Sequence, residues 1–250
     1  MIRLSVRLEA IASTVKPCRT LADIGTDHGF LPIELVRRGV CTRAYACDVR
    51  KGPLDRAQSH IALAGLTGSV IPLLSDGLAA LERDTIDTAV MAGMGGRLIS
   101  RILLESAKRG NSSPLSGLSQ LILQPQSELP LVRKTLCRVG FTIDDEVMVT
   151  DRGKFYWIFH TCPSASRSAG HPAVTKAGDE TEEELAFGHI LAQRKDPVLK
   201  EYLSKRLDVT TRLLEELSGQ SAEEGSSAYV RYGQLAKEKN LIEKELEKWE

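Results

Sequence analysis

Short apolar runs alternate with amphipathic segments along the first 160 residues of the chain. An apolar run between polar turns predicts a strand that is covered on both faces of a sheet. Such runs occupy residues 20–24, 43–47, 70–74, 87–91 and 120–123. Segments with apolar residues at helical spacing lie between them, at residues 31–38, 53–64, 97–106 and 129–139. This alternation predicts an α/β fold with a parallel sheet between two layers of helices.

Two further features border this region. Apolar residues at helical spacing predict an opening helix, and they are Leu4, Leu8, Ile11 and Val15. At the other end, residues 141–150 and 155–161 predict two strands joined by a short turn. Strands joined by so short a turn pair antiparallel, so we expect a parallel sheet with an antiparallel edge.

The composition changes after Cys162. Residues 163–180 are rich in Ser, Ala, Gly and Pro, which is typical of a linker. Amphipathic helices are then predicted at residues 181–194, 196–218 and 228–250. We therefore expect one domain at 1–162 and, at 181–250, an antiparallel helical hairpin of the coiled-coil type. Its charged faces are expected to be solvated, and recruitment of RNA or of a partner is the alternative.

Charge and cysteine content exclude several classes of protein. Lysine plus arginine and aspartate plus glutamate both number 33, which excludes a histone-like basic protein and an acidic tail protein. The five cysteines are an odd number without a C-x-x-C pair, so neither a disulfide framework nor a zinc site is expected. Charged residues interrupt the amino-terminal segment, and no apolar stretch is long enough to cross a bilayer. We expect a cytoplasmic protein that binds no metal.

The first predicted strand ends in an acidic residue and a glycine turn. The pattern Asp23-x-Gly25-x-x-x-Gly29 is neither G-x-G-x-x-G nor the phosphate loop G-x-x-x-x-G-K-[ST]. Dinucleotides and nucleoside triphosphates are therefore disfavoured as ligands.

Acidic residues also end the next two predicted strands. Asp48 lies 19 residues beyond Gly29, where a carboxylate meets ribose hydroxyls in doubly wound folds, and Asp76 stands beside Gly77. Strand-end carboxylates without a loop lysine suit a nucleoside that carries no phosphate, such as S-adenosylmethionine. Asp48 is expected to bind the ribose and Asp76 the adenine amine, with the loop 25–29 facing the methionine end. Taken singly, each acid could instead be a turn former or a helix cap.

A glycine-rich loop, Met91-Ala-Gly-Met-Gly-Gly96, follows the fourth predicted strand. Glycines allow backbone groups to approach a substrate closely, which makes Gly93 a candidate for such a contact. The alternative is a loop that serves close packing of a helix on a strand.

Several motifs together resemble one known family. They are Asp23-Ile-Gly-Thr-Asp-His-Gly-Phe-Leu-Pro32, Gly52-Pro-Leu-Asp-Arg-Ala57, Met91-Ala-Gly-Met-Gly-Gly96 and Leu123-Gln-Pro-Gln126. With the opening Leu4-Ser-Val-Arg-Leu8, they are similar to the bacterial tRNA (adenine-N1)-methyltransferases that modify adenosine 22, the TrmK family. The resemblance covers about residues 1–160 and implies a Rossmann-like class I methyltransferase fold, S-adenosylmethionine as cofactor and tRNA as substrate. One departure is His60, where the family pattern leads us to expect Asn.

The chemistry of N1 methylation is consistent with this resemblance. Adenine N1 carries a lone pair at neutral pH, so the reaction needs positioning more than it needs a base. The product is cationic, and a nearby carboxylate would stabilise the developing charge. Asp27 and His28, in the loop facing the methyl end of the cofactor, are the catalytic candidates together with Gly93. For His28, a hydrogen bond to the backbone of an ordinary loop is the alternative.

Because N1 is inaccessible inside folded tRNA, the nucleotide has to turn out of its stack. Contacts to phosphates would offset this cost, and residues 1–60 hold ten basic against six acidic residues, a charge of +4. The candidates for these contacts are Arg3, Arg7, Arg37, Arg38 and Arg43. Ordinary surface charge is the alternative. We expect a monomer that binds tRNA and no membrane.

Three other functions compete with this one. A methyltransferase of a small molecule or a protein would share the cofactor site. A non-catalytic RNA-binding adaptor would use the helical hairpin, although the intact strand-end acids argue against it. A nicotinamide oxidoreductase is disfavoured by the missing G-x-G-x-x-G.

Overall fold

The computed structural model describes residues 3–166, 180–218 and 226–249. The chain divides into two compact units, residues 1–179 and 180–250. This division falls within the linker expected at 163–180, most of which lies outside the described residues. Within the described part of the chain, no helix is long and apolar enough to span a membrane.

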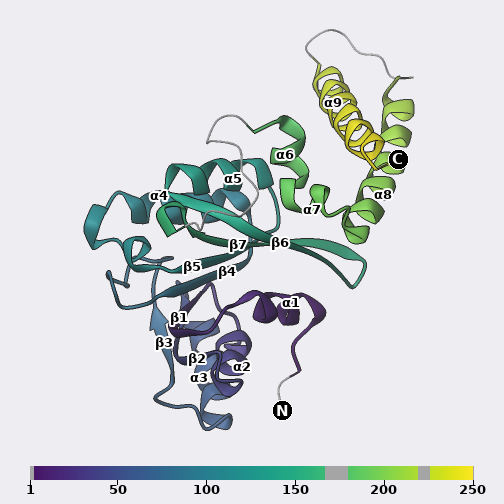
Figure 1. Ribbon diagram of the computed structural model, residues 1–250. Coiled ribbons are helices and arrows are strands. Elements are labelled where there is room, and N and C mark those ends of the chain that lie inside the picture. The colour runs from purple at the N-terminus through teal and green to yellow at the C-terminus, as the bar shows by residue number, and fades with distance from the viewer. Residues whose placement is uncertain (1–2, 167–179, 219–225, 250) are drawn as a thin grey trace. The chain divides into compact units, whose positions relative to one another are not determined.

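A seven-stranded sheet forms the centre of the first unit (Figure 1). Its strands are β1 (Cys18–Ile24), β2 (Cys41–Asp48), β3 (Val70–Leu74), β4 (Thr88–Met94), β5 (Gln120–Pro125), β6 (Phe141–Asp151) and β7 (Lys154–Pro163). Their order is β3-β2-β1-β4-β5-β7-β6. Strands β1 to β5 pair in parallel, and β7 pairs antiparallel with β5 and β6. The expected parallel sheet with an antiparallel edge is confirmed.

Helices cover both faces of the sheet (Figure 1). On one face lie α1 (Val6–Thr14), α2 (Phe30–Arg37) and α3 (Lys51–Leu63), and on the other α4 (Gly96–Ala107) and α5 (Leu129–Arg138). Three short 3₁₀ turns follow at Gly110–Ser112, Pro114–Gly117 and Ser164–Ser166. Ile11 of α1 and Ile33 of α2 are fully buried with Leu21 of β1 in one apolar cluster. Each such side chain stabilises the fold by about 1.5–3 kcal/mol.

Several strands are longer than the apolar runs that predicted them. β1 begins at Cys18, two residues before the apolar run, because Cys18 pairs with Cys41 of β2. β3 contains Pro72, which has no N–H to donate, and it accordingly forms an edge of the sheet. Backbone pairing with the neighbouring strand determines where each strand begins and ends, and the pattern of apolar residues does not predict this pairing.

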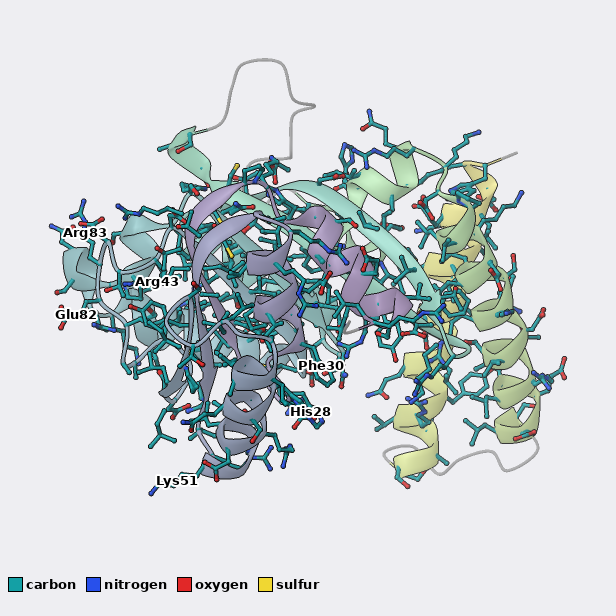
Figure 2. The ribbon with its side chains drawn as sticks, turned by 90° about the horizontal axis from the view of Figure 1, so that it is seen from below. His28, Phe30, Arg43, Lys51, Glu82 and Arg83 are labelled. Atoms are coloured by element: carbon teal, nitrogen blue, oxygen red, sulfur yellow. The ribbon has the colours of Figure 1, made fainter. Side chains whose placement is uncertain are left out.

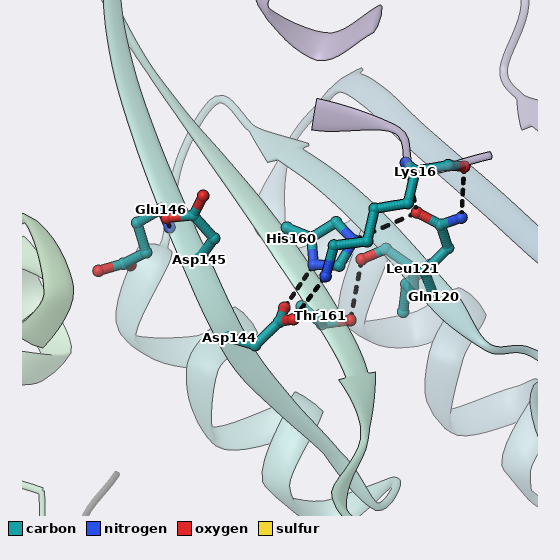
Figure 3. Close-up of polar contacts among 8 residues, drawn as sticks. All are labelled: Lys16, Gln120, Leu121, Asp144, Asp145, Glu146, His160 and Thr161. Carbon is teal, nitrogen blue, oxygen red and sulfur yellow. Dashed lines mark hydrogen bonds and ion pairs between the residues drawn. The ribbon is translucent and has the colours of Figure 1, made fainter. Parts of the chain in front are cut away.

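A polar network, buried except at the Lys16 side chain, lies at the amino end of β5 (Figure 3). His160 of β7 forms a hydrogen bond with Asp144 through Nδ1, and its Nε2 lies 3.2 Å from Oε1 of Gln120. Gln120 exchanges two hydrogen bonds with the backbone of Lys16, whose Nζ lies 3.1 Å from Asp144. Burial raises the pKa of Asp144, but the hydrogen bond from His160 and the charge of Lys16 outweigh it and leave that pKa below its usual value. The network therefore fastens the segment after α1 to the antiparallel edge.

The second unit, residues 180–250, is helical where the structure describes it. Its helices are α6 (Glu182–Phe187), α7 (His189–Gln193), α8 (Pro197–Ser218) and α9 (Ser227–Glu247). The single helix expected over 181–194 is wrong, because Gly188 adopts a φ of 91° and ends α6 there. Helices α8 and α9 lie side by side (Figure 1), and Arg206 donates hydrogen bonds of 2.6 and 2.8 Å to Glu238.

Candidate active site

The loops after β1 and β4 meet where the strand order changes direction. β1 and β4 are neighbours, but the chain continues from β1 to β2 and from β4 to β5, on opposite sides. Ligands of open α/β sheets bind at such a switch point, beyond the carboxyl ends of the strands. A pocket of about 360 Å³ lies there. It is lined by Arg7, Leu8, Asp23, residues 25–31, Ala92, Gly93 and Gln126.

Asp23 is the buried acid of this pocket. It lies near the end of β1 with only 7 % of its surface exposed. The pKa of its carboxyl is raised to about 6, chiefly because the group is buried. The negative charge of Asp48 contributes to the rise, whereas a hydrogen bond from Thr26 and the positive charge of Arg7 lower the pKa. A cationic ligand would favour the ionised form, because an opposite charge offsets the cost of burial.

The raised pKa of Asp23 predicts a distinctive dependence of stability on pH. Between about pH 4 and 6 the folded protein retains a proton that the unfolded chain has lost, so ionisation weakens folding as the pH rises. An Asp23→Asn variant lacks this ionisation. The free energy of unfolding of the variant minus that of the parent protein is expected to increase by up to about 3 kcal/mol from about pH 4 to pH 7. Urea unfolding at several pH values measures the difference, and a constant difference would contradict the raised pKa.

Asp27 and His28 are in direct contact at the pocket. The Asp27 carboxylate lies 3.1 Å from Nε2 of His28 and 2.5 Å from Nη2 of Arg56, which extends from α3. The hydrogen bond from Arg56 lowers the pKa of Asp27 and keeps the carboxylate ionised. The Asp27 side chain is 64 % exposed, so a large substrate can reach it from solvent. The structure thus brings two catalytic candidates together.

Three aromatic rings cluster at His28, and Figure 2 shows His28 and Phe30 near each other. The rings of His28 and Phe30 stack with 5.0 Å between centroids and 13° between planes. The His60 ring is tilted against the Phe30 ring, with 4.7 Å between their centroids. Nδ1 of His60 lies 2.9 Å from the backbone oxygen of His28. The residue that departs from the family pattern therefore supports the loop through both its ring and a hydrogen bond. A flat wall of this kind suits a nucleobase.

Gly93 is held on another wall by a buried glutamine. Its φ is 76°, and its N–H donates to Oε1 of Gln124 at 3.1 Å. The same oxygen accepts a hydrogen bond of 2.7 Å from Nη1 of Arg7. A Cβ on Gly93 would lie 3.3 Å from that nitrogen, so the glycine leaves room for the arginine. Arg7, which we expected to contact RNA, lines the pocket.

The two glycines of the first loop have backbone conformations that require them. Gly25 and Gly29 have φ values of 78° and 69°. A Cβ on Gly25 would lie 2.2 Å from the Cε of Met94, and Gly29 forms the amino-terminal cap of α2. Side chains are strained in this region of φ, so the shape of the loop depends on both residues.

The remaining cofactor candidates lie at neighbouring strand ends, outside the lining of the pocket. Asp48 is buried, and its Oδ1 accepts a backbone N–H two residues further on. Asp76 is exposed and lies 3.4 Å from Arg101 of α4. Gly77 packs closely against α4, since a Cβ at this position would lie 2.7 Å from the side chain of Ile102.

The arginines expected to bind RNA are not gathered in one place. Arg37 and Arg38 form ion pairs with acidic side chains of α1 and α2. Arg43 lies five residues before Asp48 on β2, roughly 16 Å away along the strand, toward the opposite end of the sheet from the pocket. Figure 2 shows it apart from His28 and Phe30. Arg3 is exposed just before α1.

Sequence reasoning did not assign roles to several residues around the pocket. They are Arg56, Phe30, Gln124 and Gln126. Gln124 carried a usable signal, because a polar residue at the carboxyl end of a buried strand is the pattern that singled out Asp23. Arg56 lies within the motif Gly52-Pro-Leu-Asp-Arg-Ala57, but nothing in its spacing or charge pointed to Asp27 as its partner.

The chain is similar to known methyltransferases. Residues 4–159 match the family model described as "Methyltransferase domain". The tRNA (adenine(22)-N(1))-methyltransferase of Bacillus subtilis is 29 % identical over 217 residues, 87 % of each chain. The crystal structure of the B. subtilis m1A22 tRNA methyltransferase TrmK has a TM-score of 0.79 at 27 % identity, over 98 % of this chain and 99 % of that one. A Streptococcus pneumoniae protein solved in complex with S-adenosyl-L-methionine is 31 % identical, with a TM-score of 0.79 over 98 % of this chain and all of that one.

The residues of this chain fit S-adenosylmethionine. The pocket combines the buried carboxyl of Asp23 with the left-handed glycines 25 and 29, and the described residues that line it include no lysine. Two more acids, Asp48 and Asp76, stand at the ends of the next strands. This set suits a nucleoside joined to a cation better than a chain of phosphates. By its matched domain, its fold and its site, the chain belongs to the methyltransferase-domain family and, within it, to the TrmK family of tRNA (adenine(22)-N1)-methyltransferases.

Proposed function

We propose that this chain methylates N1 of adenosine 22 in tRNA with S-adenosylmethionine as the methyl donor. The observation that carries the proposal is the pocket at the switch point, where Asp27, His28 and Gly93 border the same space as Asp23. Relatives named for this activity that align with most of this chain support the substrate.

When bound, the cofactor supplies a methyl group on a sulfonium centre. The task of the chain's own residues is to align that methyl group with adenine N1, with about 3–3.5 Å between the reacting atoms. Asp48 is proposed to hold the ribose and Asp76 the adenine amine of the cofactor. No residue has to remove a proton from N1, because N1 already carries a lone pair at neutral pH.

Asp27 is the proposed partner of the charge that develops on the target adenine. Arg56 keeps its carboxylate ionised and, with His28, fixes its position. A carboxylate that is already oriented stabilises a developing cation without moving at the moment of reaction. The stacked rings of His28 and Phe30 offer a surface on which an adenine turned out of the tRNA could rest.

Basic side chains are proposed to bind the phosphates of the tRNA. Arg3 and Arg43 are exposed, whereas Arg37 and Arg38 have to exchange their ion pairs before they can do so. None of the five cysteines forms a disulfide, which fits a protein that works on tRNA in the reducing cytoplasm. We propose that it acts there as a monomer.

Mass spectrometry of tRNA nucleosides tests this function. Unmodified tRNA is incubated with the protein and S-adenosylmethionine, beside a matched tRNA in which adenosine 22 is replaced by guanosine. We expect 1-methyladenosine in the first tRNA and none in the second. Equal methylation of both tRNAs would contradict the position. Methylation of a small molecule or protein instead would favour another methyltransferase, and a protein that binds tRNA but not the cofactor would favour the adaptor.

Asp48 provides a quantitative test of the cofactor site. Its replacement by alanine is expected to weaken binding of S-adenosylmethionine by about 1.5–3 kcal/mol, the scale of a hydrogen bond that involves a charged group. Calorimetry measures the dissociation constant, with Asp48→Asn as the variant that keeps the shape of the side chain. An unchanged dissociation constant in a folded Asp48→Ala protein would remove this residue from the site.

A further inference from the structure

Two cysteines lie side by side at the amino ends of β1 and β2. Cys18 is the first residue of β1, Cys41 is the first residue of β2, and the two are register partners in this parallel pair of strands. Neighbouring strands lie about 4.8 Å apart, and residues in register point to the same face of the sheet. The Cα atoms of a disulfide lie about 4.4–6.8 Å apart. The backbone therefore holds these two cysteines at a separation that a disulfide spans.

The two thiols are in contact with each other. The Cys41 thiol donates a hydrogen bond to the sulfur of Cys18. Cys41 is only 2 % exposed and belongs to the apolar cluster of the first unit, whereas Cys18 is half-buried and packs against that cluster. A small reagent can therefore reach the sulfur of Cys18 from solvent, and the sulfur of Cys41 is its buried neighbour.

The surroundings of the pair make its two members chemically unequal. The hydrogen bond from Cys41 lowers the pKa of the Cys18 thiol; burial and the charge of Asp87 oppose this effect, a hydrogen bond with Thr88 adds to it, and the pKa stays below its usual value. The same hydrogen bond, together with burial, raises the pKa of Cys41. Because the thiolate is the reactive form, Cys18 is the nucleophile of the pair. A reachable nucleophilic thiol beside a second thiol is the arrangement found in redox-sensitive cysteine pairs.

We propose that Cys18 and Cys41 form a modification site at which a hydroperoxide converts two thiols into a disulfide. In the first step, the sulfur of Cys18 attacks the peroxide, an S–O bond forms and the O–O bond breaks. The Cys18 proton ends on the departing oxygen, which leaves as an alcohol or water, and Cys18 becomes a sulfenic acid. In the second step, the sulfur of Cys41 attacks that of Cys18, the S–S bond forms, and hydroxide leaves with the Cys41 proton as water. A dithiol reductant reverses the change.

The site stands apart from the pocket at the switch point. Asp23 lies five residues beyond Cys18 on β1, roughly 16 Å away along the strand, and the described lining of the pocket includes neither cysteine. Changes at sites this far apart are usually independent, so the oxidised protein should bind S-adenosylhomocysteine within about twofold of the reduced protein. The inference does not depend on the proposed function, because it concerns the thiols alone.

Peptide mapping of the oxidised full chain tests the site. The reduced protein is treated with hydrogen peroxide, the remaining thiols are blocked with N-ethylmaleimide, and a tryptic digest is analysed without reduction. Trypsin separates the two cysteines, because Arg19 and Arg38 lie between them. We expect a linked pair of peptides that contains Cys18 and Cys41 and that dithiothreitol separates. Cys137 and Cys162, which are half-buried like Cys18, are the matched controls and should remain thiols at the same dose.

Two substitutions of Cys41 separate its two roles. Cys41→Ser keeps a hydrogen-bond donor but removes the second sulfur, so a sulfenic acid should accumulate on Cys18, where a 1,3-diketone such as dimedone traps it. Cys41→Ala removes the donor as well, and alkylation of Cys18 by iodoacetamide should become about 10-fold slower than in the parent protein. Cys137→Ser, the control variant, should change neither the linkage nor the alkylation rate.

Three results would overturn the proposal. Cys18 could react with peroxide no faster than Cys137 and Cys162, which would make the pair an inert part of the fold. The mapped disulfide could join other cysteines or two chains. Cys18 could also stop at the sulfenic acid in the parent protein as it does in Cys41→Ser, which would exclude Cys41 as its partner. The parent protein alone decides the first two results, so neither depends on how well a variant folds.

Discussion

An Asp27→Ala variant is expected to methylate tRNA about 10²–10³-fold more slowly in a single turnover, the loss typical of one preorganised electrostatic partner. The carboxylate is fixed by Arg56 and His28, remains ionised and is open to solvent at the pocket. It can therefore face the positive charge that forms on the adenine. Cofactor affinity should change much less, because the proposed cofactor contacts lie at other residues. The rate is measured with saturating tRNA, and the affinity by calorimetry.

Two further variants sharpen this test. Asp27→Asn preserves the shape of the side chain and removes its charge, so it should be nearly as slow as the alanine variant if charge is what matters. Glu82→Ala, at an exposed carboxylate away from the pocket, should keep the parent rate. A parallel loss of rate and cofactor affinity would assign Asp27 to cofactor binding, and no change in either would make it a turn residue.

Gly96→Ala is expected to destabilise the protein by about 1–3 kcal/mol, the usual effect of overpacking a tight interface. A Cβ on Gly96 would lie 2.3 Å from the backbone oxygen of Ser127 and 3.0 Å from that of Glu128. Backbone atoms cannot rotate away, so the start of α4 would have to move from the segment that leads into α5. Chemical denaturation measures the free energy of unfolding.

The adjacent glycine is the matched control. Gly95 has a φ of −64°, and a Cβ there would lie 3.3 Å from the Oγ of Ser127, the end of a side chain that can turn. Gly95→Ala should therefore cost less than about 1 kcal/mol. Equal destabilisation by both variants would show that the loop as a whole requires glycine and that the close approach at Gly96 is not the reason.

The sequence alone predicted the part of the site that depends on one geometric rule. Asp23 and Gly93 were singled out separately, one near the end of a strand and the other in the loop after another strand. The carboxyl ends of parallel strands gather at one edge, and both residues line the pocket. The loop between Asp23 and the next helix then brought Asp27 and His28 to the same place.

The part that was missed depends on contacts between distant segments. Arg7 reads as one of several amino-terminal basic residues until its partners are known. Its backbone is bound by Asp151, 144 residues away, and its guanidinium by Gln124, 117 residues away. No pattern of charge or spacing near Arg7 records these partners. The break at Gly188 was missed for a different reason, because a single glycine is tolerated inside many helices.

The central position of β1 has a consequence for how the protein is made. β1 pairs with β4, and Leu21 lies opposite Thr88, which is 67 positions further along the chain. The pocket is bordered by the loops of both strands, so in a chain emerging from the ribosome the proposed cofactor site is incomplete until β4 has joined the sheet. Closing so long a loop costs entropy before the contacts form. A ligand that contacts both loops stabilises the folded state and so offsets that cost. We therefore expect the methyl donor to favour folding of the newly made chain.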